Sequence, residues 1–175
     1  TNLTLSGYGA TWLMRKADYA DPTKYNHSED RHALTLRGCS HFRVLGLTIR
    51  SSGGDGIYMT GISARGNDNV AGYCKDVRIE DVVSDDHYRV SAGRSPLPTP
   101  SPAHPRQPAC CRQQGMSVIS VVGLRVRNST FSNTNGTAPS AGIDFEPNDR
   151  NDRLEDIELT DLTIYNNSGN GIDFA

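Results

Sequence analysis

The sequence of 175 residues predicts an all-β solenoid, a parallel β-helix of about five coils. Two repeated segments keep a common register along the chain, and neither shows the spacing of apolar residues that a helix requires. The first repeat is a small residue followed by an apolar, a polar and an apolar residue. The second repeat alternates apolar residues and carries a turn-forming residue at its fifth position. Together they indicate a chain that returns to the same place at regular intervals.

The first repeat marks one strand of each coil. Gly142 and Gly171 both begin the sequence Gly-Ile-Asp-Phe, and further copies start at Ala33, Gly56 and Gly115. We expect glycine here because the backbone must turn. Successive side chains of a strand point to opposite faces, so one residue in two fills the coil. The predicted outward column, which we expect to be open to solvent, is Thr35, Tyr58, Ser117, Asp144 and Asp173.

The second repeat marks another strand and the corner inside it. Its copies begin at Phe42, Val77, Leu124 and Ile157. The fifth positions are Gly46, Asp81, Asn128 and Asp161, residue types that tolerate a tight turn. Nine residues separate Ala33 from Phe42 and 14 separate Phe42 from Gly56, so the shortest repeat is 23 residues. Coils of this size stack about 4.8 Å apart.

The motifs "SGGDGIYM", "QQGMSVIS" and "AGIDFEP" resemble the right-handed parallel β-helix proteins of the pectate-lyase-like (pectin lyase-like) superfamily, in a less characterised branch. The resemblance covers nearly the whole chain. It implies a right-handed coil, an extracellular or cell-surface location and action on a polysaccharide. Asp85-Asp86 resembles the paired aspartates of the polygalacturonase family, but the strand start at Gly115 lacks that family's histidine. No pectate-lyase signature is matched, so the reaction stays open.

Composition narrows the class of partner. The net charge of −2 and the pI near 6.2 give no argument for binding nucleic acid. A mean hydropathy of −0.54 without a long apolar run predicts no membrane span. Asn-X-Ser/Thr sites, which would carry glycans in a secreted glycoprotein, occur at Asn2, Asn26, Asn128, Asn135 and Asn166. Asparagine is also common in β-helix turns.

One β-helix domain is expected over residues 1–175, with loop insertions at about 62–73 and 90–111. The second insertion holds six of the nine prolines, and it is either a surface arm or translated intron sequence. Solenoids normally carry caps at their ends, and neither end of this sequence shows one. We therefore expect a fragment of a longer chain, or end-to-end association with further coils or subunits.

Two cysteines share a predicted column. Cys39 and Cys74 each lie three residues before a copy of the second repeat, so they stack on adjacent coils. Either a disulfide or a buried contact between two small apolar side chains fits this placement. Cys110 and Cys111 are adjacent in the second insertion and cannot easily pair with each other.

Carboxylates gather on the outward face of the first repeat. Asp144 and Asp173 fall on neighbouring coils, and Glu146 lies about 6.6 Å from Asp144 along the strand. Close carboxylates repel, so one should hold a proton while another stays ionised. Such a set can perform acid/base or nucleophilic work on glycosidic bonds, or hold Ca²⁺. No cofactor is otherwise indicated, and a solvated acidic ridge is the simple alternative.

The upstream edge of the same face completes the candidate site. His32 and Asp55 directly precede two copies of the first repeat and join the three carboxylates as catalytic candidates. Arginine binds a uronate carboxylate bidentately, and histidine titrates near neutral pH. The candidate substrate-binding residues are Arg31, Tyr58, Arg89 and Arg112.

These residues predict action on an extracellular, acidic polysaccharide by lyase, glycoside hydrolase or epimerase chemistry. The alternative is a non-catalytic β-helix module that binds carbohydrate or builds a surface assembly. Whether the chain is an enzyme stays open at this level.

Overall fold

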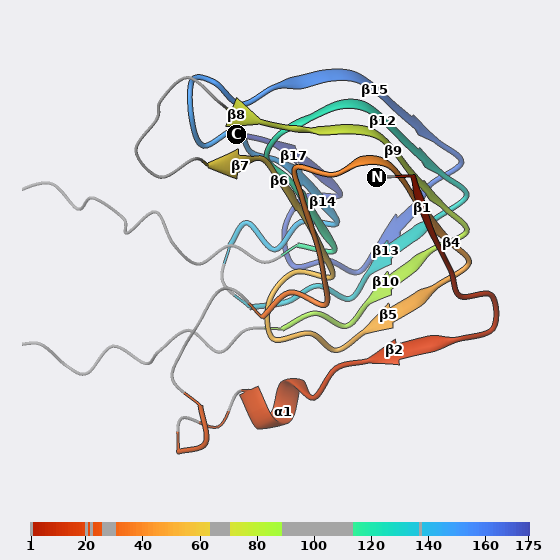
Figure 1. The fold of residues 1–175 in the computed structure, drawn as a ribbon. Coiled ribbons are helices and arrows are strands. Elements are labelled where there is room, and N and C mark those ends of the chain that lie inside the picture. Colours follow the sequence, from red (N-terminus) through yellow and green to blue (C-terminus); the bar gives the residue numbers. More distant parts are fainter. Residues whose placement is uncertain are drawn as a thin grey trace, which may run out of the picture.

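The computed structural model describes residues 2–19, 21, 23–25, 31–63, 71–88, 114–136 and 138–175. Within them the chain forms three parallel sheets of five strands each, and one four-residue helix, α1 (Lys16–Tyr19). Successive strands of a coil belong to different sheets, and each sheet gains one strand per coil (Figure 1). The chain is therefore a parallel β-helix of five coils, and the predicted fold class is confirmed.

The sheets are named A, B and C in the order in which the chain enters them. Sheet A holds β1 (Leu3–Ser6), β4 (Ser40–Leu45), β9 (Cys74–Glu80), β12 (Val121–Arg127) and β15 (Leu154–Thr160). Sheet B holds β2 (Thr11–Leu13), β5 (Thr48–Arg50), β10 (Val83–Asp85), β13 (Thr130–Ser132) and β16 (Thr163–Tyr165). Sheet C holds β3 (Leu34–Arg37), β6 (Ile57–Thr60), β11 (Met116–Val118), β14 (Ile143–Phe145) and β17 (Ile172–Phe174).

Both predicted repeats stack in the register that the sequence indicates. In sheet C, Ile57 pairs with Leu34 and with Met116, and Asp144 pairs with Ser117 and with Asp173. Sheet A aligns the second repeat in the same way, as the pairing of Phe42, Val77, Leu124 and Ile157 shows. Each side chain therefore lies above the residue that occupies its position in the coil before.

The interior of the coil is an apolar column in each sheet. The predicted inward residues of sheet C are buried from β3 to β14: Leu34, Leu36, Ile57, Met59, Met116, Val118, Ile143 and Phe145. Burying each such side chain contributes about 1.5–3 kcal/mol. Ile172 and Phe174 continue both columns in β17, the last strand of the sheet, where they are 37% and 74% exposed. Phe174 stacks on Phe145, with ring centroids 4.9 Å apart.

The corners between sheets A and B follow the prediction. Gly46, Asp81, Asn128 and Asp161 have φ angles of 65°, 57°, 45° and 54°. Glycine, Asn and Asp are the residues that adopt this left-handed conformation most readily, which explains the column. A second left-handed column, at the far end of sheet B, was not predicted: it consists of Ser51, Asp86, Asn133 and Asn166.

The glycine column that opens sheet C has a different cause from the predicted one. Gly56, Gly115, Gly142 and Gly171 are not among the glycines with positive φ, so a turn does not require them. A Cβ on Gly56 would lie 2.6 Å from the Gly115 carbonyl oxygen, and one on Gly115 equally close to that of Gly142. At Gly56, Gly115 and Gly142 the close approach of the stacked backbone, not the turn, excludes a side chain, and at Gly56 the Ser84 hydroxyl and the His87 ring would lie closer still; Gly171 has no such contact.

The described parts of the insertions leave the coil regular. The first, predicted at 62–73, starts and ends as an antiparallel pair of β7 (Ile62–Ser63) with β8 (Ala71–Gly72). The second, predicted at 90–111, lies outside the described residues. An unpredicted excursion between β2 and β3 contains α1, whose Lys16 forms an ion pair with Asp86 of the third coil.

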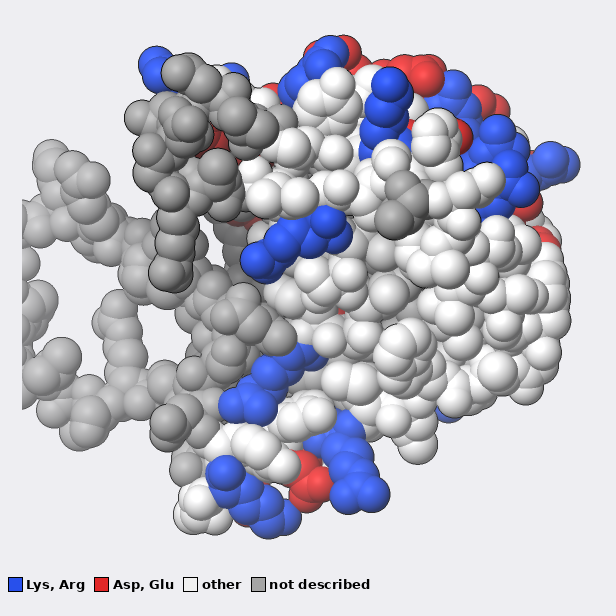
Figure 2. Space-filling view, in the orientation of Figure 1, with Lys and Arg blue, Asp and Glu red and all other residues white. Residues whose placement is uncertain are grey.

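Charge is distributed unevenly over the surface. Figure 2 shows Lys and Arg interspersed with Asp and Glu near the strands of sheet A at the upper right, beside a broad uncharged area. Ion pairs on sheet A include Arg125 with Asp156 at 2.8 Å and with Glu158 at 3.0 Å. Among the described residues, no helix is long and apolar enough to cross a membrane.

We expect Gly115→Ala to destabilise the protein by about 2–3 kcal/mol, because its methyl group would press on a carbonyl that the sheet C ladder holds in place. That carbonyl, of Gly142, accepts the hydrogen bond of Met116 N–H at 3.0 Å. Urea unfolding measures the effect.

Gly171→Ala is the matched control, because the nearest atom to its added Cβ is Ile164 Cγ2 at 3.6 Å. The control should change the free energy of unfolding by less than about 0.5 kcal/mol. Equal losses in both variants would contradict the close-approach explanation.

Candidate functional site

A largely buried polar network crosses the first four coils near the start of the strands of sheet C. It is formed by His32, Asp55, Gln114 and Asp144. His32 Nδ1 lies 3.2 Å from Asp55 Oδ2, and Gln114 N–H donates to Asp55 Oδ1 at 2.9 Å. The Gln114 side-chain Nε2 donates to Asp144 Oδ2 at 2.8 Å. One glutamine thus links two carboxylates on different coils.

The stack itself positions three of these residues. His32, Asp55 and Gln114 each directly precede a residue of the column that opens sheet C. Backbone hydrogen bonds hold this column together: Ala33 N–H donates to the Asp55 carbonyl at 3.0 Å, and Gly56 N–H to that of Gln114 at 3.1 Å. Gln114 Oε1 accepts the Ala141 N–H at 2.9 Å, which fixes its amide.

Asp55 offers His32 both a donor and an acceptor. Its backbone N–H points to His32 Nδ1 at 3.1 Å, and its carboxylate lies at 3.2 Å from the same nitrogen. A neutral ring can accept the N–H at Nδ1 and keep its proton on Nε2, or donate from Nδ1 to the carboxylate. Among the described residues, Nε2 has no hydrogen-bond partner.

Tyr58 forms the floor beneath the imidazole. The two rings stack 4.2 Å apart at an interplanar angle of 4°. Burial raises the pKa of the Tyr58 hydroxyl, and the charges of Asp55 and Glu146 raise it further, against the effects of Thr60 and Arg37. Tyr58 therefore keeps its proton at neutral pH.

The structure brings part of the predicted site together. His32, Asp55 and Tyr58 are in contact, and Glu146 lies near enough to influence Tyr58. Ser117 and Asp144 stand in the predicted column but are buried, so the expectation that they face solvent is wrong. The alternation within the strand predicts the register position of Asp144, but not its burial.

Other predicted residues lie apart from this network. Asp173 pairs with Asp144 in the sheet but accepts a hydrogen bond from Asn170 at 3.0 Å. The Arg31 guanidinium lies 5.0 Å from the ring centroids of both Tyr19 and Tyr25, in the excursion of the first coil. Arg89 and Arg112 lie outside the described residues.

The carboxylates do not assemble a metal site. Within the part of the chain that the structure describes, no group of three or more His, Cys, Asp and Glu side chains could hold a metal ion. Asp144 is occupied by Gln114 and Asp173 by Asn170, so the set predicted to hold Ca²⁺ is not drawn together around one point.

Sequence reasoning missed Gln114, although a signal was present. Gln114 occupies the position of His32 and Asp55 in its own coil, one residue before the glycine column. Polar residues repeated at this position indicate a column that apolar packing alone does not hold together. Its role as a bridge became apparent only once the register of the coils was known.

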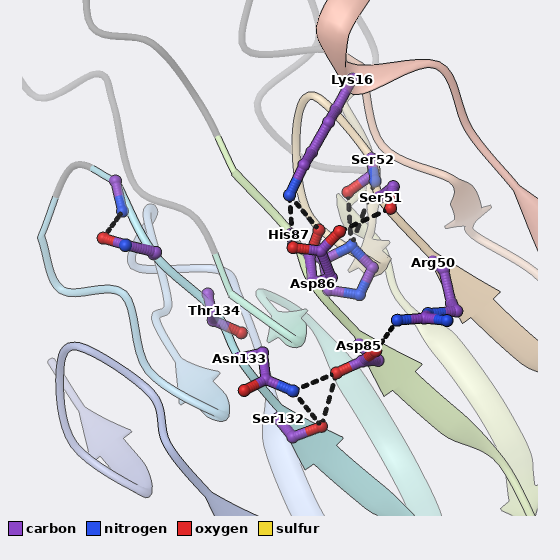
Figure 3. A network of polar contacts seen from close by, with 12 residues as sticks. Lys16, Arg50, Ser51, Ser52, Asp85, Asp86, His87, Ser132, Asn133 and Thr134 are labelled. Carbon is purple, nitrogen blue, oxygen red and sulfur yellow. Dashed lines mark hydrogen bonds and ion pairs between the residues drawn. The ribbon is translucent and has the colours of Figure 1, made fainter.

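A second polar network lies at the end of sheet B (Figure 3). Asp85 pairs with Arg50 at 2.9 Å and accepts hydrogen bonds from Ser132 and Asn133. Asp86 pairs with Lys16 and accepts the Ser51 hydroxyl at 2.6 Å. Asp85 and Asp86 resemble a pair of catalytic aspartates in the sequence. In the structure both have a structural role, because each carboxylate binds side chains from other coils.

His87 lies behind these acids and is fully buried. Its Nε2 is 2.9 Å from Ser84 Oγ, which donates to the Gly115 carbonyl, and its Nδ1 is 2.7 Å from Ser52 Oγ. These bonds fit a neutral ring with its proton on Nε2. Burial lowers the pKa of His87 to about 4, although Asp85 and Asp86 act to raise it. Both ring nitrogens form hydrogen bonds inside the protein, so the role of this imidazole is structural.

A comparison with known protein families, curated proteins and solved structures finds no match to this chain. The parallel β-helix rests on the three sheets and their register. Membership of the pectate-lyase-like superfamily stays a prediction from the sequence motifs.

Stability should fall as His87 is forced to take up a proton. The pKa of the unfolded residue is 6.5 and that of the folded one about 4, so the unfolded state binds more protons between these values. The contribution of neutral His87 to the free energy of unfolding is complete above pH 6.5 and is lost as the pH falls toward 4. The loss is about 3 kcal/mol.

Urea unfolding of the wild type and of His87→Asn between pH 7 and pH 4 isolates this contribution. The variant should show a smaller loss over that range, whatever its stability at pH 7. His41→Asn, at an exposed histidine, is the control and should leave the pH dependence close to that of the wild type. An unchanged pH dependence in His87→Asn would count against a buried neutral imidazole.

Proposed function

We propose that this chain acts on an acidic polysaccharide at the outer face of sheet C, by abstracting a proton from a uronate unit with His32. The observation that carries the proposal is the pairing of His32 with Asp55 above the Tyr58 ring. When Nδ1 carries the ring proton and donates it to the Asp55 carboxylate, the Nε2 lone pair is free to act as a base, and no described residue bonds to it. A histidine oriented in this way is suited to general acid/base work.

The burial of the two linked carboxylates favours proton abstraction over hydrolysis. Glycoside hydrolysis ordinarily needs two carboxyl groups that flank the bond to be cleaved. Asp144 has no exposed surface and Asp55 is 2% exposed, and Gln114 is bonded to both. Neither carboxylate reaches a bound sugar. A lyase or an epimerase needs one base at the carbon next to the uronate carboxylate, which the imidazole supplies.

The proposed step conserves protons and electrons. His32 Nε2 takes the proton from C5 of the uronate, and the electron pair of that bond moves toward the carboxylate. In the lyase reaction a C4–C5 double bond forms, the C4–O bond breaks, and the leaving oxygen receives a proton from the Tyr58 hydroxyl. In the epimerase reaction C5 regains a proton from water on its other face, and His32 returns the abstracted proton to solvent. Arg37, exposed on β3, offers charge for the carboxylate.

The outside location belongs to this proposal. Of the glycan acceptor sites, Asn2, Asn128, Asn135 and Asn166 are exposed in the structure, while Asn26 lies outside the described residues. Exposure is the condition that an attached glycan needs. Secretion from a eukaryotic host followed by enzymatic removal of N-glycans should lower the mass of the protein, and an unchanged mass would argue against a glycoprotein.

A binding module without turnover is the second candidate. The depth of the network favours it, because the His32 side chain is only 9% exposed and Asp55 and Asp144 less. Such a module would bind the same acidic chain through Arg37 and the ring pair, with no product. Binding and catalysis are separated by the assay below.

Activity should appear on a panel of uronate polysaccharides and should fall by about 100-fold or more in His32→Gln, because general base catalysis supplies about that factor. The measurement is the ultraviolet absorbance of unsaturated products for a lyase, and NMR of the C5 configuration for an epimerase. Unfolding curves establish that the variant is folded.

His41→Gln is the matched control. His41 also pairs with a carboxylate, Asp76 at 2.7 Å, but it lies exposed on sheet A. It should retain full activity. New reducing ends without unsaturated products would show that the chain hydrolyses the polysaccharide and does not abstract a proton. Full activity in His32→Gln would show that His32 is not the base. Binding without any product in the wild type would establish the binding module.

A further inference from the structure

A second chemically distinct site lies where coils two and three meet. Cys39 directly precedes β4 and Cys74 opens β9, and Ser40 pairs with Lys75 in the sheet. Lys75 N–H donates to the Cys39 carbonyl at 2.8 Å, so the two cysteines are stacked neighbours. Their Sγ atoms are 3.5 Å apart, and both are thiols in this structure.

The backbone geometry suits a disulfide. Stacked strands lie about 4.8 Å apart, which falls inside the range of about 4.4–6.8 Å that Cα atoms of a disulfide span. The sulfur atoms need to approach by about 1.5 Å to reach bonding distance, which rotation about the Cα–Cβ bonds can supply. No shift of the sheet A ladder is required.

Packing alone does not explain two thiols at this place. The same column continues with Val121 and Leu154 on the next coils, so an aliphatic side chain fits there. Cys74 is buried, whereas Cys39 is partly exposed. The Cys39 sulfur can therefore react with a reagent from solution, while the Cys74 sulfur lies buried next to it. This is the arrangement of an attacking thiol and a resolving thiol.

We propose that Cys39 and Cys74 form a redox-active dithiol, which low-molecular-weight disulfides such as oxidised glutathione convert into a disulfide between coils two and three. The site is independent of the polysaccharide proposal. Both oxidation states are compatible with the fold, because the bond joins residues that the β-helix already stacks.

Hydrogen bonding supports a reactive pair. The Cys39 thiol donates to Cys74 Sγ, and this bond, helped by neighbouring backbone amides, lowers the pKa of Cys74 to about 7. The same bond raises the pKa of Cys39. Near neutral pH the two sulfurs thus come to share one proton. These pKa directions favour the thiolate on Cys74, so attack from Cys39, the sulfur that solvent can reach, proceeds through the minor form in which the shared proton has moved to Cys74.

The exchange then proceeds in two balanced steps. The Cys39 thiolate attacks one sulfur of the small disulfide, whose S–S bond breaks and releases one thiolate. Cys74 loses the shared proton to solvent and attacks Cys39 Sγ, which releases the second thiolate. Two protein thiols are oxidised, and one small disulfide is reduced to two thiols.

The bond would secure the base of the first insertion. Cys74 follows β8 after one residue, and its Sγ lies 3.4 Å from the carbonyl oxygen of Thr60, the last residue of β6. A bond to Cys39 closes a loop of 35 residues along the chain. It would therefore restrict the unfolded chain and hold the hairpin root against the second coil.

The test uses Cys110→Ser/Cys111→Ser as the background, so that only two thiols remain. Native protein is equilibrated with reduced and oxidised glutathione at several ratios, and non-reducing peptide mapping identifies the products. We expect a peptide in which Cys39 is joined to Cys74. Oxidation should raise the melting temperature by roughly 5–15 °C, and a reductant should reverse the rise.

Single variants separate the two steps. Cys74→Val, the residue found at the same position on coil four, should accumulate a mixed disulfide on Cys39. Cys39→Val should leave Cys74 unmodified, because its sulfur is buried. Two free thiols in native protein, under conditions that oxidise the urea-unfolded chain, would overturn the proposal. So would a stable mixed disulfide on Cys39 in the background protein, since Cys74 would then not resolve it.

Discussion

The stacking of each coil on the one before it, residue upon residue, is the constraint on which this structure depends. Parallel pairing places every side chain about 4.8 Å from its counterparts on neighbouring coils. A residue type that suits one coil must therefore suit a column. Apolar columns satisfy this condition without further partners, as Ile57, Met116 and Ile143 do. Three glycines of the column that opens sheet C satisfy it by having no side chain where backbones approach closely.

Polar residues meet the same constraint by bonding across coils. A buried carboxylate is costly unless hydrogen bonds and opposite charges compensate for its lost hydration. Asp55 is compensated by His32 from the coil before and by Gln114 from the coil after. Asp85 receives Arg50 from one side and Ser132 from the other. The stack thus supplies partners at fixed distances, and it also makes the geometry of such a network rigid.

The same periodicity explains how far the sequence could predict the structure. Alternation within a strand and recurrence between coils are local properties, so the inward columns and the left-handed corner at Asp81 and Asn128 could be predicted. The covering of an outward face is not local, which is why the burial of Asp144 was missed. The bridge made by Gln114 depends on two side chains from different coils, and no spacing rule encodes it.

A histidine that replaces another residue type within a column can serve either packing or chemistry, and its hydrogen bonds distinguish the two cases. His87 stands in a column with Ser52, Thr134 and Asn167, where backbone hydrogen bonds join successive coils. Ser52 and Ser84 form hydrogen bonds with the two ring nitrogens of His87, so both polar groups of this side chain have partners inside the fold. His32 breaks its own column in the same way, but only Nδ1 is engaged by Asp55. Among the described residues, the two histidines therefore differ in that the stack bonds both ring nitrogens of His87 but leaves Nε2 of His32 without a hydrogen-bond partner.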